Sequence, residues 1–223
     1  MVEPEDFLDR KRDFSPFLVH LTKDDILDDE HTIPAKDVLD MILSDKTLEA
    51  RNHFCLFSPN LKELQDASLT NEFKMVCFTE TPIDHIDMLL QKVSGRNFKP
   101  EPYGLVFKKE YIRAKGGNPV FYVTKEIAKP LWQLYRPLCD KDIEQSSGKM
   151  CKLLALVTVC EEGNDWHWER EWRIAGNLEF DLNDIYFGLC REEDIPYFET
   201  KYCIKFISPY WKINKLLEKL VKK

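Results

Sequence analysis

The sequence predicts an α+β fold, with a mixed or split β-sheet core and helices packed against it. Two patterns lead to this prediction: apolar runs typical of strands alternate with helical patterns early in the chain, and strands follow one another less regularly later. The chain has 223 residues, of which 43% are hydrophobic and 32% charged, which is typical of a folded protein. We expect residues 1–16 to form an irregular lead-in and residues 17–223 a single domain.

Apolar periodicity and turn residues mark the expected elements of the first half of the chain. Pro34 and Pro82 each stand at a natural helix start, and Gly116-Gly117 at a helix end. The expected elements are strand 17–22, helix 35–50, strand 75–79, a helix from 82 to 93, loop 96–102, strand 103–107, a short helix ending at 116–117, and strand 119–123.

The second half begins with a helix that contains Pro130 and continues into the most polar loop of the chain. Periodicity alone does not decide residues 149–160, for which a helix running into irregular structure is favoured. The expected elements are helix 126–139, loop 140–148, strand 168–174, strand 184–189, helix 192–201, strand 204–207 and a terminal amphipathic helix at 212–222.

Charge and cysteine content narrow the class of protein. The net charge of −7 argues against a protein that coats nucleic acid, although nucleic-acid binding through a local basic patch near residues 108–115 stays open. The seven cysteines show no C-x-x-C spacing, so we expect no disulfide framework and no metal site. Most of them lie in apolar runs, and we expect these to be small buried hydrophobic residues in a reducing compartment. Residues 1–16 lack a signal peptide, and the apolar run Leu153–Cys160 is too short to span a bilayer. A cytoplasmic protein without membrane contact is expected.

The segment from Trp166 to Arg173 is the densest in chemically active side chains. If it is a strand, Glu169, Glu171 and Arg173 share one face. Two carboxylates on one face repel each other unless a cation lies nearby, so Arg173 is expected to neutralise one of them. The other would be available to a ligand that develops positive charge. The alternative is a salt-bridged surface strand with tryptophans packed behind it.

Two further segments carry candidate ligand-binding groups. Thr79 and Thr81 offer hydroxyls where a strand runs into a helix, whose N-terminal N–H groups suit an anion such as phosphate. Ordinary N-capping by Thr81 explains the same pattern. His20 lies in an apolar strand, and with Thr22 it would offer hydrogen bonds to a sugar, although a lone histidine in such a strand more often has a structural role.

Five segments, in this order, resemble the AbiGi-type abortive phage-resistance family, whose members are described as antitoxins. The resemblance covers residues 17–190 and implies a role in phage defence with a cognate toxin or antitoxin partner. The segments are Phe17–Thr22, Cys77–Pro82, Tyr103–Phe107, Asn118–Val123 and Trp168–Arg173.

The same order is more distantly similar to the ADP-ribosyltransferase fold. This similarity implies NAD as the substrate, with His20 as the first element of the site, Phe78 and Thr79 as the second, and Glu171 as the third. Glu169 would be the auxiliary acidic residue. It further implies contacts to NAD from Thr22, Phe78, Thr79, Thr81, Tyr103 and Arg173.

The implied reaction makes chemical sense. Breaking the nicotinamide–ribose bond creates an oxocarbenium-like cation, which the Glu171 carboxylate would stabilise. His20 would hold the adenosine-side ribose, and Tyr103 or Phe78 would stack on nicotinamide. ADP-ribose would then pass to a macromolecular acceptor or to water. The alternatives are a non-catalytic antitoxin or partner-binding protein and, third, an enzyme that modifies RNA or DNA.

Overall fold

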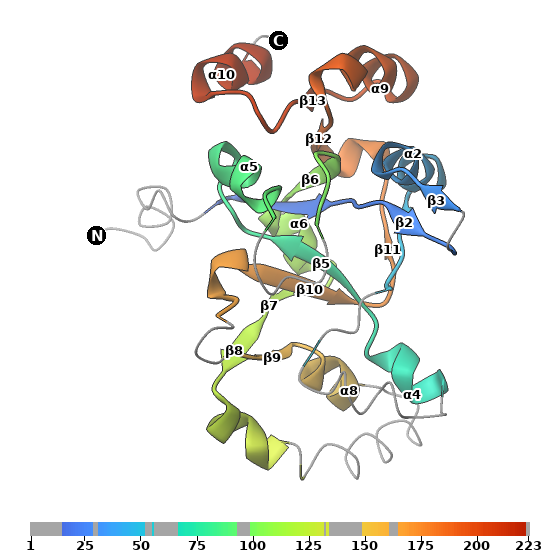
Figure 1. The fold of residues 1–223 in the computed structure, drawn as a ribbon. Coiled ribbons are helices and arrows are strands. Elements are labelled where there is room, and N and C mark those ends of the chain that lie inside the picture. The colour runs from blue at the N-terminus through green and yellow to red at the C-terminus, as the bar shows by residue number, and fades with distance from the viewer. Residues whose placement is uncertain are drawn as a thin grey trace. The chain divides into compact units, whose positions relative to one another are not determined.

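The computed structural model describes most of the chain, which divides into two compact units (Figure 1). The predicted lead-in lies outside the described residues except for Ser15 and Pro16, and the predicted loop 140–148 lies wholly outside them. The described residues are 15–28, 31–51, 55, 67–92, 99–131, 133, 149–160 and 165–221. Unit 1 comprises Met1–Thr47, Phe78–Ile112 and Glu179–Lys223, and unit 2 comprises Leu48–Cys77 and Arg113–Leu178.

Each unit is assembled from stretches that are far apart in the sequence. Unit 1 contains β1 (Phe17–Leu21), β2 (Asp25–Ile26), β3 (Thr32–Ile33), α2 (Ala35–Asp45), η1 (Ile83–His85), α5 (Ile86–Leu89), β6 (Gly104–Lys108), η3 (Leu182–Asp184), β12 (Ile185–Leu189), η4 (Glu192–Asp194), α9 (Ile195–Tyr202), β13 (Phe206–Ile207) and α10 (Ile213–Val221). Unit 2 contains α4 (Ala67–Glu72), β7 (Asn118–Pro119), β8 (Phe121–Val123), a helix at 125–131, α8 (Lys149–Leu154), β9 (Val157–Val159), η2 (His167–Glu169) and β10 (Glu171–Ala175). The chain passes between the units in β4 (Thr47–Leu48), β5 (Met75–Thr79), α6 (Lys109–Ala114) and β11 (Leu178–Glu179).

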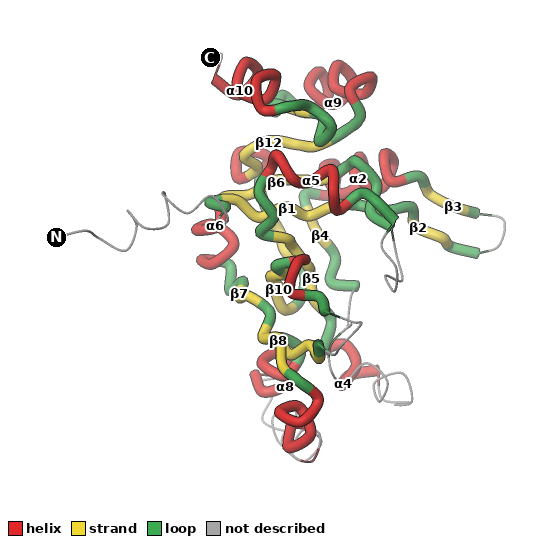
Figure 2. Tube along the Cα trace, turned by 60° about the vertical axis from the view of Figure 1, so that its left-hand side comes forward, coloured by secondary structure: helices red, strands yellow, loops and turns green. Residues whose placement is uncertain are grey.

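The prediction of an α+β fold with a mixed sheet is confirmed. In unit 1 the strand order is β13-β12-β6-β1-β5, with β12 and β13 parallel and the other pairs antiparallel. In unit 2 the order continues from the first residues of β5 to β10 and β7, and β8 pairs with β9 in a separate parallel ladder. Figure 2 shows the β2–β3 hairpin extending beside α2 in unit 1.

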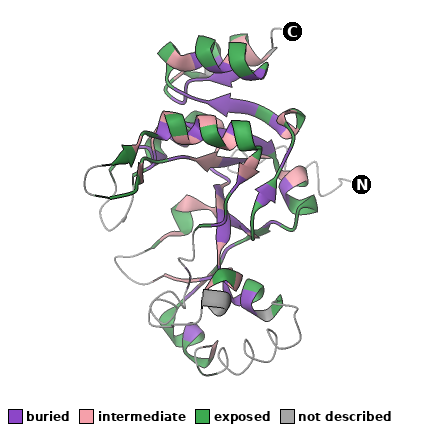
Figure 3. Cartoon of the chain, turned by 90° about the vertical axis from the view of Figure 1, so that its right-hand side faces the viewer, coloured by how far each residue is buried: buried purple, intermediate pink, exposed green. Residues whose placement is uncertain are grey.

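The core of unit 1 lies against its central strands, which are largely buried (Figure 3). Residues 104–107 of β6 are all buried, which is the pattern of a strand covered on both faces. The helix α2 follows Pro34 and buries Ala35, Leu39 and Leu43, which are spaced by four residues along one face. One core cluster joins the sheet to α5 and α10 and consists of Val19, Ile86, Leu89, Val106, Phe187, Leu189, Ile207 and Leu216.

Unit 2 has a core of its own, in which cysteines pack as small apolar side chains. Cys55 and Cys151 are buried there as free thiols, as the sequence predicted. Cys203 of unit 1, which does not lie in an apolar run, is exposed at the left-handed end of α9. The buried members of the unit 2 cluster are Cys55, Phe73, Met75, Val123, Ala128, Cys151, Leu154, Ala155 and Val157.

Several predicted bounds are wrong for identifiable reasons. The predicted helix 35–50 ends at Asp45, because Lys46 adopts a left-handed conformation, and β4 follows. The predicted strand 119–123 is two strands, since β7 and β8 pair with different partners, β10 and β9. Residues 157–159, expected to be irregular, form β9 against β8.

The predicted strand 168–174 begins only at Glu171. Residues 167–169 form the 3₁₀ helix η2, and Arg170 has a φ of 47°, which interrupts the extended backbone. Side-chain alternation therefore does not place Glu169 on the face of Glu171 and Arg173. The shared face of Glu171 and Arg173 is correct, because both lie within β10.

Candidate functional site

His20 and Phe78, from two of the segments singled out in the sequence, meet in unit 1. His20 is half-buried in the middle of β1, and its ring centroid lies 5.8 Å from that of Phe78 at the end of β5. Phe78 is 3% exposed and makes an edge contact with Phe107 of β6 at 6.1 Å. The imidazole therefore lies at the margin of an aromatic cluster formed by Phe78 and Phe107.

The Thr79–Thr81 turn is internally bonded. The hydroxyl oxygens of Thr79 and Thr81 lie 2.8 Å apart, and the Thr81 N–H donates to the Thr79 hydroxyl at 3.2 Å. Glu80 points to Lys109, whose Nζ lies 2.5 Å from Oε1, and both side chains are mostly buried. Pro82, rather than Thr81, precedes the short helix η1, and no side chain caps it. The predicted N-cap is therefore wrong, and the segment after Thr81 is a 3₁₀ turn followed by the four-residue α5.

Two other predicted NAD contacts, Thr22 and Tyr103, are engaged within unit 1. The Thr22 hydroxyl lies 3.2 Å from the carbonyl oxygens of both Ala35 and Tyr103, and Thr22 is 3% exposed. The Tyr103 hydroxyl donates to Asp194 at 2.7 Å. Burial, followed by this hydrogen bond, raises the pKa of Tyr103 above its ordinary value. Both hydroxyls thus have structural roles.

In unit 2, the Glu171 carboxylate is held by a buried arginine. Nε of Arg173 donates to Oε1 of Glu171 at 3.0 Å, and Nη2 donates to Oε2 at 2.7 Å. The same guanidinium donates to the carbonyl oxygen of Ala155 at 2.6 Å and to the hydroxyl of Thr158 at 3.0 Å. The side chains of Arg173 and Glu171 are only 3% and 14% exposed. Burial acts to lower the pKa of Arg173, but the Glu171 charge outweighs it and raises that pKa above its ordinary value.

The predicted site residues thus fall into two groups. The structure places His20, Thr22, Phe78, Thr79, Thr81 and Tyr103 in unit 1, and Glu169, Glu171 and Arg173 in unit 2. Within unit 1 it brings His20 to Phe78, and within unit 2 it joins Glu171 to Arg173. The meeting of His20 with Glu171 in one cleft stays a prediction.

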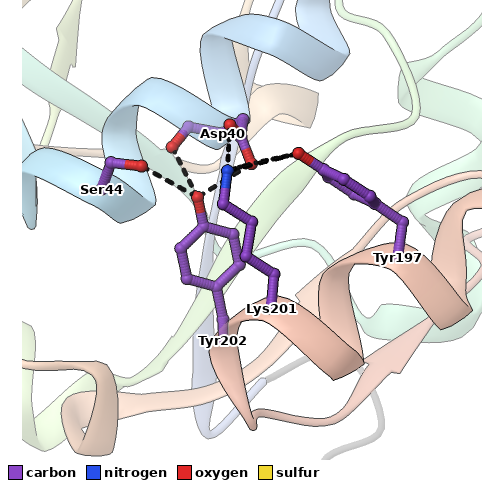
Figure 4. Close-up of polar contacts among 5 residues, drawn as sticks. All are labelled: Asp40, Ser44, Tyr197, Lys201 and Tyr202. Carbon is purple, nitrogen blue, oxygen red and sulfur yellow. Dashed lines mark hydrogen bonds and ion pairs between the residues drawn. The ribbon is translucent and has the colours of Figure 1, made fainter.

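Sequence reasoning missed a polar seam between α2 and α9 in unit 1 (Figure 4). Lys201 Nζ donates to both carboxylate oxygens of Asp40, at 2.9 and 2.7 Å, while the hydroxyls of Tyr197 and Tyr202 donate to Oδ1 at 3.2 and 2.8 Å. One turn away on α2, Lys36 pairs with Asp194 at 2.5 Å. The repeat of polar residues at 36, 40 and 44, which flanks the apolar stripe of α2, was the available signal.

The seam predicts a loss of stability in acid. Burial acts to raise the pKa of Asp40, but hydrogen bonds from Lys201 and the two tyrosines outweigh it, so the pKa is lowered from 3.8. Stability from a depressed carboxyl pKa is present above pH 3.8 and is lost as the pH falls through the lower value of the folded state. We expect Asp40→Asn to cost about 1–3 kcal/mol at pH 7 and progressively less below pH 4.

Urea unfolding at pH 7, 4 and 3 measures this loss. Glu192→Gln is the matched control, because its carboxylate has a lysine and a tryptophan partner but is exposed. A cost of Asp40→Asn that does not change with pH would show that its hydrogen bonds do not depend on the charge of Asp40.

Comparisons with protein-family models, curated proteins and solved structures find no match for this chain. Among the described residues, no helix is both long enough and apolar enough to cross a membrane.

Proposed function

We propose that this chain is a bacterial phage-defence protein with an ADP-ribosyltransferase-like fold that uses NAD, transferring ADP-ribose to a macromolecular acceptor or to water. The observation that carries the proposal is the contact between His20 and Phe78 at 5.8 Å. It joins the first and second segments of the sequence resemblance, and it places a nitrogen base beside a flat apolar ring. That combination suits a ribose hydroxyl and a nicotinamide ring.

The catalytic part of the proposal assigns the developing ribosyl cation to Glu171. A carboxylate that is already fixed by a bidentate arginine loses little conformational freedom when a substrate binds, which favours transition-state stabilisation. The positive charge of Arg173 also makes the electrostatic potential at the Glu171 carboxylate less negative. At least one of the two hydrogen bonds between Arg173 and Glu171 must therefore weaken when the substrate binds. A substitution can test this assignment.

The test is NAD consumption and label transfer by the purified chain. We expect turnover by the wild type and a fall of at least about 100-fold in Glu171→Gln, since an electrostatic stabiliser of the transition state is worth that much. His20→Ala is expected to raise KM for NAD mainly. Glu169→Gln, outside β10, is expected to retain more activity than Glu171→Gln.

Folding has to be controlled, because Glu171→Gln leaves the buried Arg173 without its counter-charge. Each variant is therefore assayed at a temperature where circular dichroism shows that it is folded. Leu43→Ala is the control for destabilisation, because Leu43 is buried in α2 and is not a candidate site residue. Equal turnover by Glu171→Gln and wild type would refute the catalytic assignment.

A second candidate is a non-catalytic antitoxin or partner-binding protein. It is favoured by the engagement of both Glu171 oxygens by Arg173, together with the engagement of the Thr22 and Tyr103 hydroxyls. The net charge of −7 suits a basic partner. This candidate predicts no NAD turnover by the chain alone and tight, salt-sensitive binding to a cognate toxin; NAD consumption by the pure chain would exclude it.

A further inference from the structure

Three side chains with metal-binding chemistry come together in unit 2, and the proposed function assigns a role to none of them. Cys160 directly follows β9, His167 is the first residue of η2, and Asp165 lies two residues before it. One thiol, one carboxylate and one imidazole atom from these residues all lie within 4.8 Å of one another. Residues 161–164, which connect them, lie outside the described residues. The expectation of no metal site relied on the absence of closely spaced cysteine pairs. A site built from one cysteine, one aspartate and one histidine does not show that pattern.

Both segments that carry the cluster are anchored to β8. The Cys160 N–H donates to the carbonyl oxygen of Val123 at 2.9 Å. The His167 ring packs on the ring of Tyr122, with centroids 4.6 Å apart. The Tyr122 hydroxyl in turn accepts from the Glu171 N–H at 3.1 Å, which ties β10 to the same point. The positions of Cys160 and His167 are thus set by one strand.

Hydrogen bonds orient the three groups further. The Trp166 N–H donates to the Cys160 sulfur at 3.4 Å, which fixes the position of the thiol relative to η2. Oδ1 of Asp165 accepts from the His167 N–H at 2.9 Å and lies 2.6 Å from Nδ1 of the same residue. A metal ion bound by this carboxylate and by Nδ1 would replace that hydrogen bond, because the Nδ1 lone pair would then bind the ion.

We propose that Cys160, Asp165 and His167 form a binding site for a transition-metal ion of the Zn²⁺ class. Thiolate, imidazole and carboxylate are the donors that Zn²⁺ takes, at about 2.0–2.3 Å. Three such donors around a tetrahedral ion lie about 3.3–3.6 Å apart. The cluster, whose ligand atoms lie within 4.8 Å of one another, would have to open at the 2.6 Å contact between Asp165 and His167 to admit the ion. Asp165 and His167 are exposed, which leaves the fourth position to water or a substrate.

Another Asp–His pair in the chain shows why the cysteine matters. Asp28 and His31 repeat the same contacts, with Oδ1 2.9 Å from the backbone nitrogen and 2.8 Å from Nδ1 of the histidine. That pair, in the β2–β3 hairpin, is not part of any three-donor group among the described residues. The Asp–His contact alone is therefore a turn motif, and the third donor, Cys160, distinguishes the proposed site.

The experiment is a titration of the reduced, full-length chain with Zn²⁺ by calorimetry and with Co²⁺ by absorption spectroscopy. We expect one Zn²⁺ per chain and a sulfur-to-cobalt charge-transfer band. Cys160→Ser and His167→Asn should each weaken Zn²⁺ binding at least about tenfold, and Cys160→Ser should remove the band. The exposed Cys203→Ser and the turn-motif variant His31→Asn are matched controls that should leave both unchanged.

Two results would overturn the proposal: no binding of Zn²⁺ at micromolar concentrations, or equal binding by the wild type, Cys160→Ser and His167→Asn. If Cys160→Ser does not fold, His167→Asn decides alone, because the exposed imidazole is not part of the unit 2 core. The outcome is independent of NAD turnover, since none of the three residues belongs to the proposed NAD site.

Discussion

Arg173→Met is expected to lower the free energy of unfolding by about 3–5 kcal/mol, as removal of one partner from a buried ion pair does elsewhere. The arginine is 3% exposed and satisfies both Glu171 oxygens together with the Ala155 carbonyl oxygen. Its loss leaves a mostly buried carboxylate without a cation, and the methionine cannot donate a hydrogen bond to either group. Urea unfolding followed by circular dichroism measures the effect.

Arg113→Met is the matched control. The Arg113 guanidinium lies over the Trp172 ring at 5.5 Å, but its side chain is exposed, so we expect a cost of about 1 kcal/mol or less. The double variant Glu171→Leu/Arg173→Met should recover part of the loss, because removal of both charges avoids an unpaired one. A cost of Arg173→Met no larger than that of Arg113→Met would show that the ion pair does not organise unit 2.

This stability effect bears directly on the proposed NAD chemistry. If Glu171 serves only as the counter-ion of Arg173, the double variant Glu171→Leu/Arg173→Met should recover NAD turnover together with stability. If Glu171 stabilises a ribosyl cation, the double variant should be folded and inactive toward NAD. The comparison therefore separates a structural role of Glu171 from a catalytic one.

The sequence predicted well those elements whose pattern is local. The strand 75–79 agrees with β5 residue by residue, and the terminal helix α10 begins one residue after its predicted start. In both, apolar spacing and flanking residues contain the whole signal. The α+β class followed from the order of such elements.

The secondary-structure predictions were wrong where the structure of a segment depends on a partner distant in the sequence or on the backbone conformation of a single residue. Residues 157–159 become a strand because β8 offers hydrogen bonds to them, a contact that no local window contains. The left-handed conformations of Lys46 and Arg170, which end α2 and delay β10, occur at residues with no special preference for it. The cluster of Cys160, Asp165 and His167 likewise depends on how η2 folds back on β9, and the spacing of its members gave no cue.

The candidate site was predictable only in part, for the same reason. Alternation correctly placed Glu171 and Arg173 on one face of a strand. Arg173 was expected to neutralise one of the two carboxylates, and the one that it pairs with is Glu171. The sequence did not reveal that Arg173 donates hydrogen bonds to both oxygens of the Glu171 carboxylate, nor that Arg173 itself is buried. The contact between His20 and Phe78 follows from β1 and β5 being neighbours, and strand pairing is a property of the whole fold.

Gly104→Ala is expected to cost about 3 kcal/mol or more, because the added methyl group would meet backbone rather than a movable side chain. A Cβ at Gly104 would lie 2.2 Å from the carbonyl oxygen of His20 and 3.2 Å from the Cα of Leu21. Gly104 pairs with Leu21 of β1 on one side and with Leu189 of β12 on the other, so β6 cannot shift away without loosening a second ladder. Thermal and urea unfolding measure the loss.

Gly188→Ala provides the contrast that tests this reasoning. Its added Cβ would lie 2.1 Å from a ring atom of Phe206, and substitution of Phe206 by a smaller residue would remove this clash. In a double-mutant cycle, Phe206→Leu should therefore offset part of the cost of Gly188→Ala, while its cost should simply add to that of Gly104→Ala. If Gly104→Ala is as stable as the wild type, β1 and β6 are not packed as described. If it is destabilised and not rescued, the glycine of the Tyr-Gly-Leu-Val-Phe segment is required by the close approach of two strands at His20, with or without a ligand.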